Sequence, residues 1–186
     1  MRQIVHTYED PLDLIWLHAA QQMGMTVVRD DSVFASWDGH GTLTIGTQET
    51  LDPDDSLAQM ILHETCHALV EGPEAFHKPD WGLDITDRSQ LVHEHACLRL
   101  QAALAGSYGL RMFFASTTNA RKYYDALPDD PLSGDEPATL MARDGFDRAT
   151  VGPWSSILSD AMNRTLAVGQ LIEGMAPSSS LWQTVR

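Results

Sequence analysis

The sequence predicts an α+β fold, in which a small and mostly antiparallel sheet is followed by a larger helical part. Three short runs rich in β-branched and aromatic residues lie close together, at 25–29, 32–37 and 41–47, with Asp and Gly turn residues near them. Beyond them the apolar residues recur at helical spacing, and Gly and Pro separate the helical segments. The sheet is therefore expected to be local, and most of the chain helical.

The N-terminal part is predicted to contain a strand and a helix ahead of this sheet. Residues 2–8 are a strand candidate, and Asp10-Pro11 begins a helix that runs to about Met23 before Gly24. The run at 41–47 is polar and flanked by glycine, which suits an edge strand. Such an edge either pairs with an extended peptide or is simply protected by its polar residues, and the sequence leaves both open.

A capped helix is predicted after the sheet, ending at about residue 71. Asp52 provides an N-cap, Pro53 occupies the first helical position, and two further aspartates place negative charge in the first turn. Gly72 and Pro73 then end the helix. One side of it is expected to lie against the core through an apolar stripe that consists of Leu57, Ile61 and Ala68.

Two histidines and a glutamate in this helix have the spacing of a metal site. His63 and His67 lie four residues apart, so both imidazoles share one helix face and can reach a single zinc ion. Glu64 lies about a hundred degrees around the helix, where it can miss the metal and act on a water molecule as general base. The alternative is a chance HExxH pattern, expected at on the order of a few per cent in such a chain. A hydrolytic zinc site takes its third protein ligand from elsewhere.

A second helix offers a third ligand. Asp87 is its predicted N-cap and Gln90 completes a capping box, and the helix is expected to run to about Ala105. Glu94 lies on the core-facing side, where an ionised carboxylate is costly to bury unless a cation such as zinc compensates it. That side is formed by Leu91, Leu98, Ala102 and Ala105.

Two further histidines flank Glu94. His95 also falls between Leu91 and Leu98 on the helix, so a site made of His63, His67 and His95 is chemically sound. The residues alone therefore leave His93, Glu94 and His95 open as the third ligand.

The sequence HETCH at 63–67, followed by Glu94 twenty-seven residues after His67, resembles the gluzincin branch of the zincin-like metallopeptidases. The resemblance covers about residues 2–106. It implies a zincin-like fold in which His63, His67 and Glu94 bind Zn2+. It also implies hydrolysis of a peptide or small amide substrate, in which Glu64 takes a proton from a zinc-activated water and returns it to the leaving amine.

The chain departs from the gluzincin pattern at two points. Leu98 stands four residues after Glu94, where many gluzincins carry an acidic residue that steadies a ligand histidine, so this role would pass to a residue such as Asp84 or Asp87. These enzymes also use a His or Tyr to stabilise the oxyanion, but no histidine follows His95. Tyr123 and Tyr124 are the catalytic candidates for this role, beside Tyr108 and Arg111, and both would equally suit packing positions.

The two cysteines each follow a proposed ligand by three residues. Cys66 comes after His63 and Cys97 after Glu94, so two helices that share a metal would bring the thiols near each other. Disulfide geometry is demanding and cytosolic thiols are usually reduced, so we expect buried free cysteines rather than a disulfide.

Composition excludes several classes of function. The chain of 186 residues has a net charge of −14, which repels phosphate backbones and anionic lipids, so we expect no nucleic-acid or membrane partner. Neither a signal peptide nor an apolar run of membrane-spanning length is visible, which predicts a cytoplasmic protein. Oligomeric state cannot be read from the sequence.

The C-terminal part is predicted to be a helical extension, residues 107–186, which packs on a metal-binding core formed by residues 1–106 within one structural domain. Its expected helices lie at 118–127, 138–143 and 153–174, with an acidic, proline-rich loop at 128–137. Taken together, these features predict a zinc metallopeptidase-like hydrolase. The alternatives are a zinc enzyme acting on a small metabolite and a metal-binding protein without catalysis.

Overall fold

The computed structural model describes residues 3, 5–84, 87, 90–116 and 120–185. These residues form six α-helices and a three-stranded mixed sheet, which confirms the α+β class. In chain order the elements are α1 (Pro11–Gln22), β1 (Thr26–Arg29), β2 (Ala35–Trp37), β3 (Thr42–Ile45), α2 (Leu57–Glu71), the 3-10 helices η1 (Pro73–His77) and η2 (Pro79–Gly82), α3 (Leu91–Gly106), α4 (Arg121–Asp125), α5 (Pro137–Val151), α6 (Ser155–Leu171) and the 3-10 helix η5 (Leu181–Thr184).

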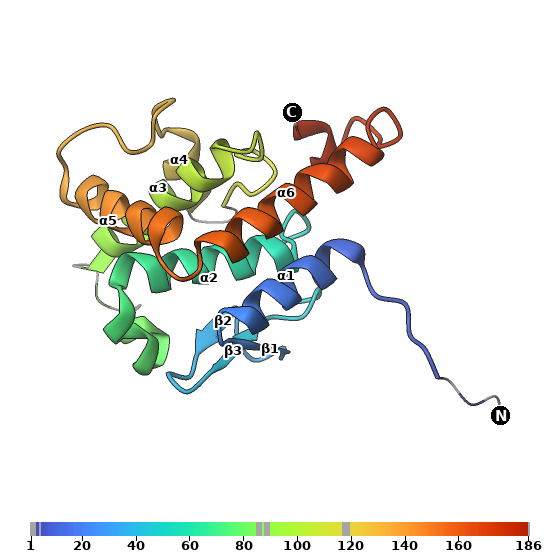
Figure 1. Ribbon diagram of the computed structural model, residues 1–186, viewed down its shortest axis with the longest axis horizontal. Coiled ribbons are helices and arrows are strands. Elements are labelled where there is room, and N and C mark those ends of the chain that lie inside the picture. Colours follow the sequence, from blue (N-terminus) through green and yellow to red (C-terminus); the bar gives the residue numbers. More distant parts are fainter. Residues whose placement is uncertain (1–2, 4, 85–86, 88–89, 117–119, 186) are drawn as a thin grey trace.

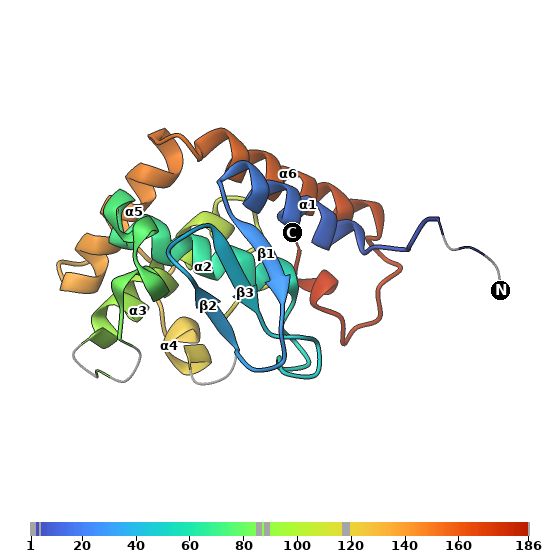
Figure 2. The same ribbon diagram turned by 90° about the horizontal axis from the view of Figure 1, so that it is seen from below.

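Helix α2 lies at the centre of the molecule. Figure 1 shows it between the sheet on one side and α3 and α5 on the other, and α1 packs against both α2 and α6. Figure 2 shows the three strands lying across α2. Thirteen of the fifteen residues of α2 are buried, so this helix is enclosed almost all round rather than along the single stripe that the sequence predicted. Its polar residues therefore lie inside the fold.

The sheet differs from the predicted one in its pairing. The strand order is β1-β3-β2, with β3 parallel to β1 and antiparallel to β2, so the sheet is mixed rather than mostly antiparallel. The predicted edge strand at 41–47 is wrong, because β3 lies in the middle and buries Leu43 and Ile45 completely. Strands β1 and β2 are the edges. The sequence could not reveal this order because strand pairing depends on contacts between distant residues.

Helix α2 begins later than predicted. Its N-cap is Ser56, whose Oγ accepts a hydrogen bond of 3.1 Å from the backbone N–H of Gln59. The predicted cap, Asp52, lies in a preceding turn in which its backbone N–H donates to Asp55 Oδ2 at 3.0 Å. The predicted end is confirmed: Gly72 is the C-cap with φ of 83°. Arg148 of α5 also bonds a free carbonyl of the last turn, Leu69 O, at 2.6 Å.

Helix α3 also lacks its predicted start. It begins at Leu91 with Gln90 as its N-cap residue, three residues after the predicted cap Asp87, and Gln90 Oε1 accepts from the backbone N–H of Asp84 at 2.6 Å. Leu91 is 54% exposed and does not face the core, whereas the other members of the predicted stripe are buried: Leu98, Ala102 and Ala105. Glu94 therefore lies where the exposed start of the helix meets its buried remainder.

Other elements agree with the prediction in part. Among residues 2–8 no strand is present in those that the structure describes, while residues 2 and 4 lie outside them. Helix α4 falls within the predicted 118–127, of which 118 and 119 are not described. Helix α5 is much longer than 138–143 and packs against α2 and α3. The division into 1–106 and 107–186 stays a prediction.

In the described part of the chain, no helix has both the length and the hydropathy that a membrane span requires.

Candidate metal centre

The structure brings the three predicted metal ligands together. His63 and His67 lie one turn apart on α2, with ring centroids 4.8 Å apart and ring planes nearly perpendicular. Glu94 reaches across from α3, so that its Oε1 lies 3.7 Å from His63 Nε2 and its Oε2 lies 3.2 Å from His67 Nε2. Two imidazole nitrogens and a carboxylate on two packed helices form a donor set that suits zinc.

The two histidines beside Glu94 are engaged elsewhere. His93 forms an ion pair with Glu71, with 2.7 Å between Nδ1 and Oε1. His95 stacks on Tyr123 with ring centroids 3.7 Å apart and the planes almost parallel. The geometry thus favours Glu94 over both histidines as the third ligand.

Gln101 determines which nitrogen of His63 is free. Its amide Nε2 donates to Phe114 O at 2.6 Å, which turns its Oε1 toward His63 Nδ1 at 2.9 Å. An amide oxygen can only accept, so His63 carries its proton on Nδ1 and presents the lone pair of Nε2 toward Glu94. A metal-binding histidine needs this arrangement.

This supporting role had been predicted for Asp84 or Asp87, which instead line a cavity near the histidines. The gluzincin pattern places an acidic residue in this role, so it gives no indication of Gln101. Its position seven residues after Glu94, two helical turns along the same face, was the available signal.

His67 and Glu94 form an ion pair. Burial alone would lower the pKa of His67, but the hydrogen bond and charge of Glu94, together with the charges of Glu64 and Glu71, raise it. Burial would raise the pKa of Glu94, yet His63 and His67 lower it to about 2. The cluster therefore favours a positive charge beside Glu94, which a proton or a metal ion can provide. Among the described residues, His67 Nδ1 is buried without a hydrogen-bond partner.

Glu64 lies beside this cluster at a cavity of about 650 Å³, whose lining also includes His67 and Glu94. Its side chain is almost buried, and its Oε2 accepts a 2.8 Å hydrogen bond from the indole N–H of Trp81. The remaining walls come from β2, from η2 and from the segment that leads into α3; they are Val33, Ala35, Ser36, Asp80, Trp81, Leu83, Asp84, Asp87, Gln90 and Leu91. The segment after α2 thus lines a pocket beside the histidines.

A second set of side chains could hold a metal through Cys97. Ligand atoms of His63, His67 and Cys97 lie within 4.8 Å of one another, and Cys97 Sγ is 3.6 Å from His63 Nδ1. This set is not the one that the gluzincin resemblance implies. Cys97 Sγ approaches the same His63 nitrogen, Nδ1, that Gln101 Oε1 contacts.

The two predicted free thiols are buried and unoxidised. Burial and the neighbouring thiol of Cys66 raise the pKa of Cys97 well above its ordinary value. Cys97 is absent from the cavity lining, whereas Glu94 belongs to it. The position at the cavity favours Glu94 over Cys97 as the third ligand of an open site.

The two tyrosines predicted to be catalytic have other contacts. Tyr124 is buried, and its hydroxyl donates to Arg111 O at 2.8 Å. The hydroxyl of Tyr123 accepts from Arg99 Nε at 2.9 Å. Neither belongs to the residues that line the cavity. Stabilisation of an oxyanion by either one stays a prediction, and these contacts do not support it.

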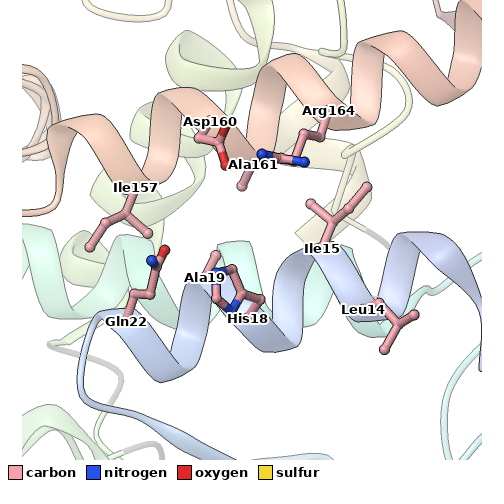
Figure 3. A pocket seen from close by; sticks show the side chains of 9 residues that line it. All are labelled: Leu14, Ile15, His18, Ala19, Gln22, Ile157, Asp160, Ala161 and Arg164. Carbon is pink, nitrogen blue, oxygen red and sulfur yellow. Dashed lines mark hydrogen bonds and ion pairs between the residues drawn. The ribbon is translucent and has the colours of Figure 1, made fainter.

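Another pocket, of about 290 Å³, lies between α1 and α6 (Figure 3). His18 and Gln22 reach it from α1, and Asp160 and Arg164 form an ion pair with each other on α6 at 2.7 Å. It contains none of the proposed metal ligands.

Comparison of the chain with family models, curated proteins and solved structures gave no match. The function is therefore inferred from the residues and geometry of the site.

Proposed function

We propose that this protein is a zinc-dependent hydrolase with a zincin-like centre, in which His63, His67 and Glu94 bind Zn2+ and Glu64 is the general base. One observation carries the proposal: the two histidine Nε2 atoms converge on Glu94 at a cavity that Glu64 also lines. A structural metal site, which only holds two helices together, needs neither a general base nor an open cavity.

Each side chain has a distinct task in this proposal. Zinc at these ligands would act as a Lewis acid and lower the pKa of a water molecule. Glu64 accepts the proton of that water and delivers it to the leaving amine. Because Trp81 occupies Oε2 of Glu64, its Oε1 is the oxygen left for the proton.

The cavity wall formed by β2 suits an extended peptide. The backbone groups of Phe34 and Asp38 bond β3, through Gly46 N to Phe34 O and Asp38 N to Thr42 O. The alternation of an antiparallel ladder therefore turns the N–H and C=O of Ala35 toward the free edge of the sheet. Ala35 lines the cavity with Glu64, so a peptide that added a strand there would run past the base. This edge replaces the predicted one at 41–47.

The proposal is tested by zinc analysis and by Glu64→Gln. We expect one tightly bound zinc per chain, and cleavage of peptides from a synthetic library that stops when the metal is chelated. Glu64→Gln should retain zinc and lose hydrolysis by about 10²-fold or more, because general base catalysis contributes on that scale. Unchanged hydrolysis in this variant, or a wild-type protein that binds no zinc, would contradict the proposal.

A metal-binding protein without catalysis is the second candidate, because Cys97 approaches His63. Two matched variants separate the candidates. Zinc bound through Cys97 would be weakened by Cys97→Ser and not by Glu94→Gln, whereas the hydrolase proposal predicts the reverse.

A further inference from the structure

Glu64, the proposed general base, accepts a hydrogen bond from a buried tryptophan. The indole of Trp81 donates to Glu64 Oε2 at 2.8 Å, and both side chains are more than nine-tenths buried. An indole N–H can donate but cannot accept or ionise, so it can hold a carboxylate oxygen without taking its proton. From this contact and its surroundings we infer that Trp81 is a positioning residue for Glu64, fixing the carboxylate so that Oε1 faces the reacting water. This inference rests on the proposed function.

The backbone that carries Trp81 is held in a costly conformation. Asp80 and Trp81 have φ of 46° and 59°, in the left-handed region that residues other than glycine rarely occupy. Two such residues in succession persist only where the surroundings fix them, and they are often found at functional sites. Here they turn the indole N–H toward α2.

The carboxylate of Asp80 connects η2 to strand β2 through hydrogen bonds. Its Oδ1 accepts hydrogen bonds from Ser36 Oγ at 3.0 Å and from the backbone N–H of Trp37 at 3.1 Å. The hairpin between β2 and β3 also packs closely here: a Cβ added to Gly39 would lie 2.9 Å from backbone atoms of Lys78 and Pro79. The position of Trp81 is thus set by β2 and by its hairpin.

Aromatic packing fixes the plane of the indole. Trp81 stacks on Trp37 with ring centroids 4.6 Å apart and 4° between the planes. The N–H of Trp37 points elsewhere in the same cluster and donates to Phe76 O at 3.0 Å. The stack therefore contains two buried indoles with one hydrogen bond each, of which only that of Trp81 reaches the proposed base. This gives a matched control.

The test compares Trp81→Phe with Trp37→Phe in the zinc-loaded full-length protein. Both changes keep an aromatic ring in the stack and remove one indole N–H. With the best-cleaved library peptide, we expect Trp81→Phe to lower kcat by about tenfold to a hundredfold, as expected when a catalytic group is misplaced by about an ångström. Zinc content should stay unchanged and KM should change much less than kcat, and Trp37→Phe, which keeps an aromatic ring against Trp81, should lower kcat far less than Trp81→Phe. Equal kcat in the two variants would overturn the inference.

A second measurement needs no substrate. The indole N–H signals of Trp81 and Trp37 in a 1H–15N NMR spectrum are assigned by their loss in the two variants. Glu64→Gln should shift the signal of Trp81, whose acceptor loses its charge, and leave that of Trp37 in place. An unmoved Trp81 signal would overturn the inference whether or not peptides are cleaved. A shifted signal in a zinc-loaded protein that cleaves nothing would instead refute the proposed function, and with it the catalytic role of the contact.

Discussion

Gln101 is the residue on which the identity of the metal-binding nitrogen depends. Replacing it with Leu removes the acceptor for His63 Nδ1 and the donor to Phe114 O. We expect zinc affinity, measured by competition with a chelator, to fall about tenfold to a hundredfold, the usual effect of losing such support.

Gln59→Leu is the matched control for this change. Gln59 is another buried glutamine, on α2, whose Oε1 has no hydrogen-bond partner among the described residues. Its replacement should leave zinc affinity unchanged. Wild-type affinity in Gln101→Leu, or an equal loss in both variants, would show that the hydrogen bond to His63 does not matter.

Glu94 and His67 give the metal-free protein a defined pH dependence. Because the pKa of Glu94 is lowered from 4.5 to about 2, its contribution to stability is complete above pH 4.5 and is lost as the pH falls through about 2. Because the pKa of His67 is raised from 6.5, its contribution is complete below pH 6.5 and is lost as the pH rises through the raised value. The ion pair therefore stabilises most between these limits.

Glu94→Gln tests this window. In the presence of a chelator, the free energy of unfolding measured with urea should differ most between wild type and variant near about pH 5.5, and the difference should shrink as the pH rises and His67 loses its proton. A difference that is constant or grows into the alkaline range would contradict the assigned ion pair.

At this scale the sequence predicted the residues that have regular spacing. His63, Glu64 and His67 follow from one turn of helix. Glu94 is one of three candidates on the next helix, beside His93 and His95, and is preferred through the gluzincin resemblance. Trp81 could not be assigned to Glu64, because their contact depends on an irregular backbone that no local pattern encodes.

The contact between the β2–β3 hairpin and η2 is the element-scale feature on which the cavity depends. Gly39 has φ of 75°, and an added Cβ would meet backbone atoms at 2.9 Å. Gly174 has the same φ, but nothing lies within 4 Å of its added Cβ. Alanine at either position should cost about 1 kcal/mol for the left-handed backbone. Gly39→Ala should cost a further 1–3 kcal/mol, roughly, for overpacking.

Urea denaturation of the two glycine variants measures this difference. Equal losses of stability would mean that the hairpin does not pack closely on η2. If the packing is as described, Gly39→Ala should also shift the NMR signal of the Trp81 indole, because Lys78 and Pro79 lead directly into that segment.

At the scale of elements, the sequence did not predict the exact helix ends or the order of the strands. Asp52-Pro53 has good capping chemistry, yet Ser56 starts α2 because the aspartates close a turn of their own. Helix α5 runs through Gly145, a residue that lowers helix stability in an exposed position. Leu100 and Val70 lie so close to this glycine that an added Cβ would be 2.8 Å from Leu100. Close packing against α3 thus explains both the glycine and the continued helix.

For the whole molecule, the fold brings three distant segments around one cavity. Helix α2 contributes two metal ligands and the base, α3 contributes the third ligand, and β2 with η2 forms the opposite wall. Helix α5 packs behind α2 and α3 and keeps them together. The sequence indicated the α2–α3 pair through its chemistry, but the wall formed by β2 depended on a strand order that only the structure supplies.

The most direct test of the central claim is a crystal structure of the zinc-loaded protein, with anomalous diffraction at the zinc edge to locate the metal. The account predicts one zinc ion bound by His63 Nε2, His67 Nε2 and a carboxylate oxygen of Glu94, with Zn–N distances of about 2.0–2.1 Å. Its remaining position should open onto the cavity beside Glu64. Zinc bound to the sulfur of Cys97, or imidazoles of His63 and His67 turned away from a common ion, would contradict it.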